Sequence, residues 1–324
     1  MGEWLESLVP WGTEFIVWVQ SFSGGWLRSV FRFFTLLGNE EFYLLLLPIV
    51  YWGIHKRLGI TLGYLVMLSV WLNDVFKHLF GIPRPADARI QAPWPETSPS
   101  FPSGHSQNAV AGWGYLALRF RVPAGTVVAI LLILGIGLSR IALGVHFPQD
   151  VLGGWAIGLV LLFVYARAEG RVVPWLGRQR LAARAALAVV VPLLLILIHP
   201  PDVNGFYPAE GAITPGSVMV GLGIGFLMEH AWVRFRVHGP LWQRALRLAV
   251  GLVLIGILWS VPRSMVPEGL PYAAEAVIRF LRYSVLGWAC AFFCPWLFVK
   301  LRLASQEGEL IEPSSDVSGR LSAA

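Results

Sequence analysis

The chain has 324 residues, of which 56% are hydrophobic and only 14% are charged. Its mean hydropathy is +0.64, whereas a water-soluble domain carries charge on roughly a quarter of its residues. This composition argues against a soluble enzyme and favours a chain that lies largely in a bilayer. The net charge of +6 does not indicate nucleic-acid binding, because the basic residues lie in short loops between apolar runs and not along one helical face.

The first part of the chain mixes aromatic and charged side chains, and no apolar run there is long enough to span a membrane. Trp and Phe recur among Glu and Arg, as in helices that lie in the plane of the membrane interface. We therefore expect residues 1–38 to form one or two amphipathic interfacial helices.

Apolar runs recur along the rest of the chain, at or near the length of about 20 residues that a membrane crossing needs. The runs lie at about residues 39–56, 59–80, 104–120, 123–143, 150–168, 182–199, 214–233, 243–262 and 280–301. The first and third runs are short and depend on their flanks. The predicted fold is all-α, a polytopic transmembrane helix bundle with about nine spans.

The basic residues are unequally divided between the two sets of loops that nine spans create. Of the 25 Lys and Arg residues, 16 lie in one set together with the C-terminal segment, and nine lie in the other. The positive-inside rule places the richer set in the cytoplasm, with the N-terminus outside and the C-terminus inside.

Two glycine groups in the apolar runs predict close helix packing. Gly154 and Gly158 form a GxxxG pattern, and Gly221, Gly223 and Gly225 form a tight cluster further on. A nucleotide-binding loop would need a preceding strand, which the sequence does not provide. Small residues at this spacing let helix backbones approach each other in a membrane.

Three polar clusters interrupt the apolar chain, and in the predicted topology all three lie at span ends on the non-cytoplasmic side. Their chemically active residues are Lys77 and Arg84 in the first cluster, Ser103, Gly104 and His105 in the second, and Arg140, His146 and Asp150 in the third. Charged groups near the membrane core are costly, so such clusters mark a functional site.

Five residues of these clusters are predicted to bind phosphate. Lys77, Arg84 and Arg140 supply three cations, which suit the negative charge that a phosphoryl group spreads over three oxygens. Arg offers a planar fork to two oxygens, while Lys offers a point charge. Ser103 and Gly104 open a predicted helix, whose free N–H groups favour an anion.

The two histidines of these clusters can supply the covalent chemistry. His146 is the predicted nucleophile, because Asp150 four residues later can hold one ring nitrogen and leave the other free to attack. Attack would give a phosphohistidine, while His105 would protonate the leaving oxygen and then activate water. The sequence offers no carboxylate-rich or Cys/His-rich cage, so neither a metal nor another cofactor is expected.

Taken together, the clusters resemble the signature of the type 2 phosphatidic acid phosphatase superfamily, which reads Lys-x6-Arg-Pro, Pro-Ser-Gly-His and Ser-Arg-x5-His-x3-Asp. The matching residues are Lys77, Arg84, Pro85, Pro102, Ser103, Gly104, His105, Ser139, Arg140, His146 and Asp150. The resemblance implies that Lys77, Arg84 and Arg140 bind phosphate. It also implies that His105 is the acid, that His146 is the nucleophile, and that no metal is needed.

Segments 38–43 and 71–74 further resemble the glucose-6-phosphatase and sphingosine-1-phosphate phosphatase branches, whose members have extra spans after the core. We interpret residues 39–170 as the phosphatase core and residues 171–304 as additional transmembrane helices. Residues 305–324 are expected to form a polar cytoplasmic tail.

The sequence thus predicts a metal-independent membrane phosphatase that acts on a lipid phosphate or diphosphate through a phosphohistidine. Candidate substrates are phosphatidic acid, phosphatidylglycerophosphate, polyprenyl diphosphate and sphingoid phosphates. The expected partners are this substrate and the bilayer, and the oligomeric state stays open. The expected location is a bacterial inner membrane with a periplasmic site, or an endoplasmic reticulum membrane with a lumenal one.

Three alternatives belong to other classes. The substrate could be a soluble ester such as glucose 6-phosphate, as in the glucose-6-phosphatase branch. A vanadate-dependent haloperoxidase would have a similar anion pocket. A lipid transporter could retain a phosphate site without turnover, but transporters often show repeated halves, and residues 171–324 carry no second copy of the clusters.

Overall fold

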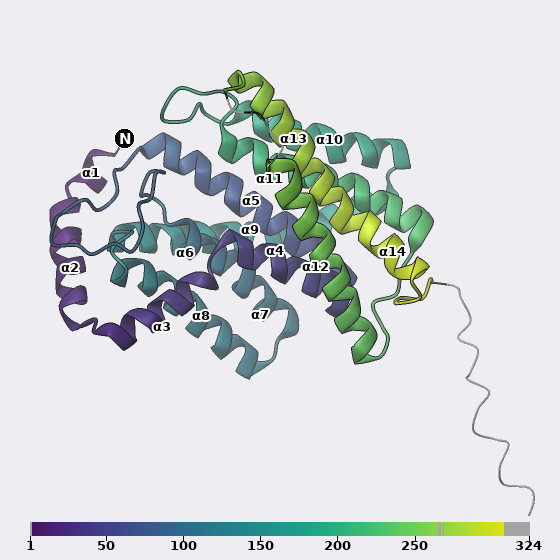
Figure 1. The fold of residues 1–324 in the computed structure, drawn as a ribbon, viewed down its shortest axis with the longest axis horizontal. Coiled ribbons are helices and arrows are strands. Elements are labelled where there is room, and N and C mark those ends of the chain that lie inside the picture. Colours follow the sequence, from purple (N-terminus) through teal and green to yellow (C-terminus); the bar gives the residue numbers. More distant parts are fainter. Residues whose placement is uncertain (1, 265–266, 268, 308–324) are drawn as a thin grey trace, which may run out of the picture.

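The computed structural model describes residues 2–264, 267 and 269–307, and these residues form helices without any β-strand (Figure 1). The predicted all-α bundle is therefore confirmed. The α-helices are α1 (Glu3–Glu6), α2 (Val9–Phe22), α3 (Gly25–Leu36), α4 (Glu40–Pro48), α5 (Lys56–Phe80), α6 (Gly104–Ala109), α7 (Tyr115–Phe120), α8 (Pro123–Ala142), α9 (Pro148–Arg178), α10 (Leu181–Ile198), α11 (Glu210–Met228), α12 (Leu241–Ser264), α13 (Tyr272–Trp288) and α14 (Cys294–Lys300). Four π-helical segments continue them, namely η1 (Ile49–Ile54), η2 (Val110–Gly114), η3 (Glu229–Val233) and η4 (Ala289–Phe293).

Among the described residues, seven helices are long and apolar enough to cross a membrane. They are Lys56–Phe80, Pro123–Ala142, Pro148–Arg178, Leu181–Ile198, Glu210–Val233, Leu241–Ser260 and Tyr272–Lys300. The two remaining predicted spans are helical but short. The helix pair α4–η1 covers 40–54 and the run α6–η2–α7 covers 104–120, so they extend about 22 and 25 Å against a hydrocarbon core of about 30 Å.

The N-terminal helices lie against the core beside α8 and α9 (Figure 1). Ile16 of α2 is fully buried with Phe147 in a small apolar cluster. The exposed rings of Trp11, Trp18 and Trp26 are those expected at a membrane interface. The interfacial position of residues 1–38 stays a prediction.

The GxxxG pattern of α9 packs closely against another helix, as predicted from the sequence, and the structure shows that this helix is α6. A Cβ atom at Gly154 would lie 2.6 Å from the carbonyl oxygen of Ser103, and one at Gly158 would lie 2.9 Å from that of Gln107. Larger residues would force these two helices apart. The close packing holds the start of α9, which carries Asp150, beside the start of α6.

Helices α10 to α14 form a second group that packs on the core through α11 and α5 (Figure 1). The glycine cluster of α11 makes this packing close. A Cβ at Gly221 would overlap the backbone of α13, one at Gly223 would lie 2.7 Å from Ala188 of α10, and one at Gly225 would lie 2.6 Å from Ala291 of η4. The predicted packing role of these glycines is confirmed. The domain limits stay a prediction, and most of the predicted tail at 305–324 lies outside the described residues.

Candidate active site

A cavity of about 390 Å³ brings the three polar clusters together. Six of the predicted site residues line it, namely Lys77, Arg84, Gly104, His105, Arg140 and His146. The other two do not line it: Ser103 directly precedes Gly104 in the chain, and Asp150 contacts His146. Both imidazoles therefore face one cavity.

The two cations of the first cluster are anchored on the loop between α5 and α6. Lys77 Nζ donates to Ser98 Oγ at 2.9 Å and to the carbonyl oxygen of Pro99 at 2.6 Å. Arg84 donates from Nε to the carbonyl oxygen of Ser98 at 2.8 Å and from Nη1 to that of Val145 at 2.8 Å. The hydrogen bonds to backbone oxygens fix both cations at the cavity wall without neutralising their charge.

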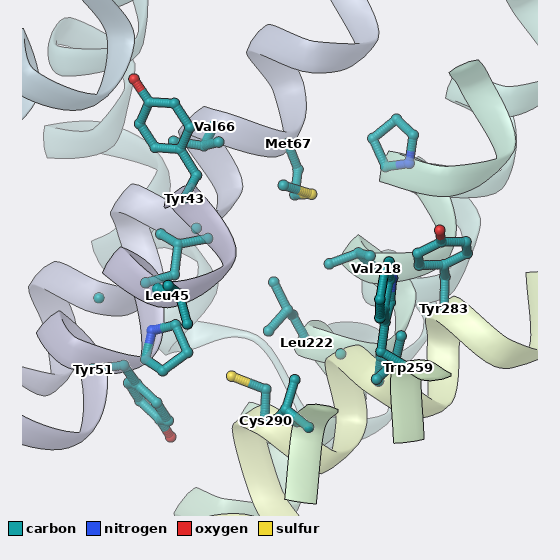
Figure 2. Close-up of a pocket in the computed structure, with 18 of the residues that line it drawn as sticks. Tyr43, Leu45, Tyr51, Val66, Met67, Val218, Leu222, Trp259, Tyr283 and Cys290 are labelled. Carbon is teal, nitrogen blue, oxygen red and sulfur yellow. The ribbon is translucent and has the colours of Figure 1, made fainter. Parts of the chain in front are cut away.

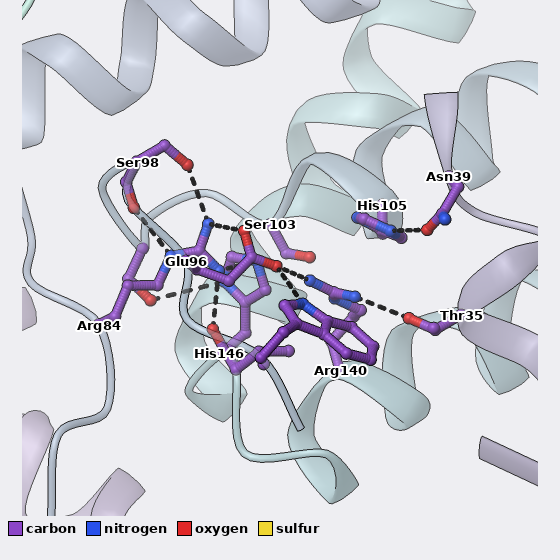
Figure 3. A network of polar contacts seen from close by, with 12 residues as sticks. Thr35, Asn39, Arg84, Glu96, Ser98, Ser103, His105, Arg140 and His146 are labelled. Carbon is purple, nitrogen blue, oxygen red and sulfur yellow. Dashed lines mark hydrogen bonds and ion pairs between the residues drawn. The ribbon is translucent and has the colours of Figure 1, made fainter. Parts of the chain in front are cut away.

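Arg140 and Arg84 are bridged by a carboxylate (Figure 3). Arg140, which is only 1% exposed, donates from Nη2 to Glu96 Oε1 at 2.7 Å and from Nη1 to Thr35 Oγ1 at 2.7 Å. The other oxygen of Glu96 lies 3.5 Å from Arg84 Nη2. An anionic group thus occupies the position where two guanidinium groups converge, and a phosphate oxygen would compete for the same donors.

Glu96 is ionised in this position. Burial raises its pKa, but the charge of Arg84, a hydrogen bond from Trp94 and the contacts with Arg140 outweigh this effect, so the pKa lies below the ordinary value. The guanidinium of Arg140 also lies 5.9 Å from the Trp94 ring. The loop between α5 and α6 therefore supplies both an anion and an aromatic face to the predicted phosphate-binding Arg140.

The predicted pair of His146 and Asp150 is present at the start of α9. His146 Nδ1 lies 3.3 Å from Asp150 Oδ2, and this oxygen also accepts from the backbone N–H of Phe147 at 2.8 Å and from the Ser100 hydroxyl. On the other side of the ring, Nε2 lies 3.0 Å from Nη1 of Arg84. Because Arg84 can only donate, Nε2 carries the lone pair, and the proton on Nδ1 points to the carboxylate.

His146 is held in the neutral state that a nucleophile requires. Burial lowers its pKa well below the ordinary histidine value, and the charges of Arg84, Arg140 and Lys77 lower it further. The imidazole therefore stays unprotonated at Nε2 at neutral pH, with its lone pair toward Arg84.

His105 reaches the cavity from the first turn of α6, on the opposite side from His146. Its Nε2 donates to Asn39 Oδ1 at 2.8 Å (Figure 3). The residue before Asn39 is a glycine, and a Cβ at Gly38 would lie 2.9 Å from the His105 ring. The turn between α3 and α4 thus packs directly on the imidazole and holds it.

Ser103 caps α6 and joins it to α9. Its Oγ accepts from the backbone N–H of Ser106 at 3.4 Å, and its own N–H donates to the carbonyl oxygen of Asp150 at 3.0 Å. A Cβ at Gly104 would lie 3.0 Å from Asn73 Oδ1. Glycine at this position therefore lets the first turn of α6 pack against Asn73, which lines the same cavity.

Sequence reasoning missed several residues that support or line the cavity. The missed residues are Thr35, Asn39, Glu96, Ser98 and Ser100 on the core side, and Glu210, Thr214, Arg279 and Tyr283 on the C-terminal helices. Asn39 had a usable signal, since it belongs to segment 38–43, which resembles the glucose-6-phosphatase and sphingosine-1-phosphate phosphatase branches, and so did Asn73 and Asp74, which also line the cavity and belong to segment 71–74. Across the described part of the chain, no group of three His, Cys, Asp or Glu side chains could hold a metal ion.

Comparison with known proteins identifies the family. The model of the PAP2 superfamily matches residues 58–173, and that of the PAP2 superfamily phosphatase, transmembrane extension, matches residues 213–306. Phosphatidylglycerophosphatase B of Bacillus subtilis is 35% identical over 155 residues, which cover 43% of this chain and 73% of that protein. The chain belongs to the PAP2 superfamily. It is a phosphoric ester hydrolase of the membrane.

Two further PAP2 relatives match longer stretches. Lipid phosphate phosphatase delta of Arabidopsis thaliana is 24% identical over 313 residues, which cover 86% of this chain and 74% of the relative. Sphingosine-1-phosphate phosphatase 2 of Mus musculus is 30% identical over 220 residues, which cover 62% of this chain and 58% of that relative. The similarity to these proteins thus extends beyond the PAP2 core into the C-terminal helices.

The carboxylate between the two arginines leads to a testable expectation. Replacing Glu96 by Gln is expected to lower the inhibition constant of orthovanadate about tenfold. This change corresponds to about 1.4 kcal/mol of binding free energy. The variant keeps the size of the side chain but removes the negative charge that competes for Arg84 and Arg140. Vanadate inhibition of phosphate release in detergent measures the change.

The matched control for this variant is Glu14→Gln. Glu14 pairs with the exposed Arg89 and does not line the cavity, so the inhibition constant should stay the same. Weaker vanadate inhibition in the Glu96→Gln variant would contradict the competition and would instead assign Glu96 to holding the arginines in place.

Proposed function

We propose that this PAP2 enzyme hydrolyses the phosphate ester of a membrane lipid through a phosphohistidine on His146. The observation that carries the proposal is the single cavity in which Nε2 of His146 faces the guanidinium of Arg84 and which Lys77, His105 and Arg140 also line. A nucleophile, an acid and three cations around one space are what phosphoryl transfer requires.

The reaction would proceed in two steps. In the first, Nε2 of His146 attacks phosphorus and the bond from phosphorus to the ester oxygen breaks, while His105, acting as the imidazolium, gives its Nδ1 proton to the leaving alkoxide and becomes neutral. In the second, His105 takes a proton from water, the oxygen attacks phosphorus, and the bond to Nε2 breaks to release phosphate. Asp150 would stabilise the imidazolium character that His146 gains in the first step.

The cations would stabilise the charge that develops on the transferred group. Lys77, Arg84 and Arg140 reach the cavity from α5, the α5–α6 loop and α8, so they can surround a tetrahedral anion from different directions. Ser103 and Gly104 would add the backbone N–H groups at the start of α6.

The proposed substrate class is supported by the relatives and by the membrane setting. Phosphatidylglycerophosphatase B, lipid phosphate phosphatase delta and sphingosine-1-phosphate phosphatase 2 are named for phosphorylated lipids. Residues of transmembrane-length helices line the cavity, among them Lys77, Arg140 and Thr214, so the site lies on the part of the chain that meets the bilayer. From the asymmetry of basic residues, the site faces the non-cytoplasmic side, which is the periplasm in a bacterium or the lumen of the endoplasmic reticulum.

Phosphate release from a substrate panel in detergent with EDTA tests this proposal. The purified enzyme is expected to hydrolyse at least one of phosphatidic acid, phosphatidylglycerophosphate, a polyprenyl diphosphate and a sphingoid phosphate, to be inhibited by orthovanadate, and to keep its activity in the chelator. Hydrolysis of glucose 6-phosphate alone would favour a soluble substrate. Lipid transport without phosphate release would favour a transporter, and bromide oxidation with vanadate and peroxide would favour a haloperoxidase.

A further inference from the structure

The turn between α3 and α4, residues 35–39, contacts two different residues of the active site (Figure 3). Thr35 Oγ1 accepts from Arg140 Nη1 at 2.7 Å, and Asn39 Oδ1 accepts from His105 Nε2 at 2.8 Å. The match to the PAP2 family model begins only at residue 58. A short segment that precedes this match therefore contacts both the predicted acid and a predicted phosphate-binding cation.

The backbone of the α3–α4 turn is compact. The N–H of Gly38 donates to the carbonyl oxygen of Thr35 at 3.0 Å, and the N–H of Asn39 donates to that of Leu36 at 3.3 Å. Such bonds between residues three apart tighten the end of a helix. Thr35, in the last turn of α3, and Asn39, just after it, thus reach the active site from one compact element.

Two glycines seat this turn directly on α8. A Cβ at Gly135 of α8 would lie 2.5 Å from the ring of Phe34, and a Cβ at Gly38 would lie 2.6 Å from a methyl carbon of Ile136. A larger side chain at either position would force its neighbours to shift, because the contact leaves no space. Since Arg140 lies on α8 five residues after Gly135, the close approach holds the turn beside its guanidinium.

Helix α4 holds the turn from the other side. Tyr43, four residues after Asn39, is buried, and a Cβ at Gly112 of η2 would lie 2.8 Å from its ring. Gly112 belongs to the helical run that begins with α6 and carries His105. Tyr43 also lines the apolar cavity between the PAP2 core and the C-terminal helices (Figure 2). Asn39 and His105 therefore lie at the starts of two helical segments that meet at Tyr43 and Gly112.

The contact with Asn39 determines which nitrogen of His105 transfers a proton. An amide oxygen can only accept a hydrogen bond, so Nε2 carries a proton in both the neutral and the charged imidazole. The proton that the ring gives to a leaving group, and takes back from water, is then the one on Nδ1. Without the amide oxygen, the neutral ring could carry its proton on either nitrogen.

The contact with Thr35 orients the guanidinium of Arg140. This guanidinium is buried, and its Nη1 donates to Thr35 while its Nη2 donates to Glu96, in the position expected for phosphate. A planar guanidinium that is held at one nitrogen presents the other nitrogens in a fixed direction. Thr35 thus acts on the anion site, and Asn39 acts on proton transfer.

We propose that Thr35 and Asn39 are positioning residues of the active site, Thr35 for Arg140 and Asn39 for His105. The inference rests on the proposed function, in which Arg140 binds the phosphoryl group and His105 protonates the leaving oxygen. It gives the N-terminal segment a part in catalysis in addition to its predicted place at the membrane interface. Residues that only supported the fold would affect anion binding and proton transfer together, whereas Thr35 and Asn39 should each affect one of them.

The test of Asn39 compares two phosphate monoesters. One is a lipid monophosphate, whose leaving alkoxide needs a proton, and the other is p-nitrophenyl phosphate, whose leaving phenolate does not. In Asn39→Leu, kcat/KM for the lipid ester should fall at least about thirtyfold, and kcat/KM for the nitrophenyl ester should change less than about threefold. Asn39→Asp keeps an oxygen acceptor in the same place and should keep kcat/KM for the lipid ester within about fivefold.

The test of Thr35 measures anion binding. Thr35→Val keeps the branched shape but leaves the buried guanidinium without an acceptor, so the inhibition constant of orthovanadate should rise at least about fivefold. The ratio of kcat/KM between the two esters should stay within about threefold. Thr35→Ser keeps the hydroxyl and should keep the inhibition constant within about twofold. Ser29→Ala is the matched control and should change neither quantity, because the exposed Ser29 hydroxyl donates to Gly25 within α3.

His105→Gln separates a failure of this inference from a failure of the proposed function. It should change the ratio of kcat/KM between the two esters at least about a hundredfold. If it does so while Asn39→Leu leaves the ratio unchanged, or if Thr35→Val leaves vanadate inhibition unchanged, the inference is overturned and the phosphatase mechanism stands. Equal changes of both quantities in both variants would overturn it too, since they would mean support of the fold alone. An unchanged ratio in His105→Gln, or no hydrolysis of either ester by the unchanged enzyme, would refute the proposed function itself.

Discussion

Replacing His146 by Ala is expected to abolish phosphate release, with a loss of at least about 10⁴-fold in kcat. The variant removes the only imidazole nitrogen that faces Arg84 within the described cavity, and no other nucleophile is held in its place. Rapid quenching with a labelled substrate provides the direct measurement. The unchanged enzyme should retain a label that is stable in base and lost in acid, as a phosphohistidine is, and His146→Ala should retain none.

Two controls separate the nucleophile from other histidines. His105→Gln should still form the labelled enzyme from an ester with a good leaving group, which needs no proton, but should release the phosphate slowly. His230→Ala removes an exposed imidazole of η3 and should keep full activity. Label retained in His146→Ala would refute the assignment of the nucleophile.

The convergence of the polar clusters could be predicted because each cluster is short and lies at the end of a helix. Lys77 and Arg84 flank the end of α5, while His146 and Asp150 flank the start of α9. A residue just before a helix lies close to the first turn of that helix, so His146 and Asp150 are kept near each other by the local chain. The contact between the His146 ring and Asp150 could therefore be expected from spacing, and the structure has it at 3.3 Å.

The partners of the cations could not be predicted, because they come from distant parts of the chain. Thr35 and Arg140 are 105 residues apart in the sequence, and Glu96 lies in an irregular loop without periodicity. Only the packing of α3 on α8 brings the first pair together. A single polar residue in a loop has many solvated positions open to it, and the tertiary fold selects one.

The number of membrane spans was the least secure part of the predicted fold. The runs at 39–56 and 104–120 are apolar enough for a span, yet the structure divides each into short α-helical and π-helical pieces. Hydropathy depends on composition and does not give the exact ends of a helix, and these two helical runs, 40–54 and 104–120, are shorter than a full crossing needs. The second of these short helices begins at the active site with Ser103 and His105, where a precise position of the first turn matters more than a full crossing.

Replacing Arg140 by Lys is expected to lower kcat/KM by about 10² to 10³, the loss typical when one charged donor to a developing oxyanion is removed. Lys keeps the charge but not the planar fork, and Arg140 uses two separate nitrogens, one for Thr35 and one for the anion position occupied by Glu96. In Arg140→Lys, the shorter side chain would leave the ammonium of residue 140 buried and without the Thr35 hydroxyl as a partner. Steady-state kinetics on the preferred lipid phosphate measure the loss.

The matched control for Arg140 is Arg89→Lys. Arg89 lies in the same α5–α6 loop region as Glu96 but is half exposed and pairs with Glu14 and Asp87 outside the cavity, so kcat/KM should change less than about twofold. A fall in kcat with unchanged KM in Arg140→Lys would assign the guanidinium to the transition state. A rise in KM alone would mean that it binds substrate and transition state equally. Retention of kcat/KM within about threefold would remove Arg140 from the proposed mechanism, because a cation that contacts the transferred phosphoryl group cannot lose its fork without loss of rate.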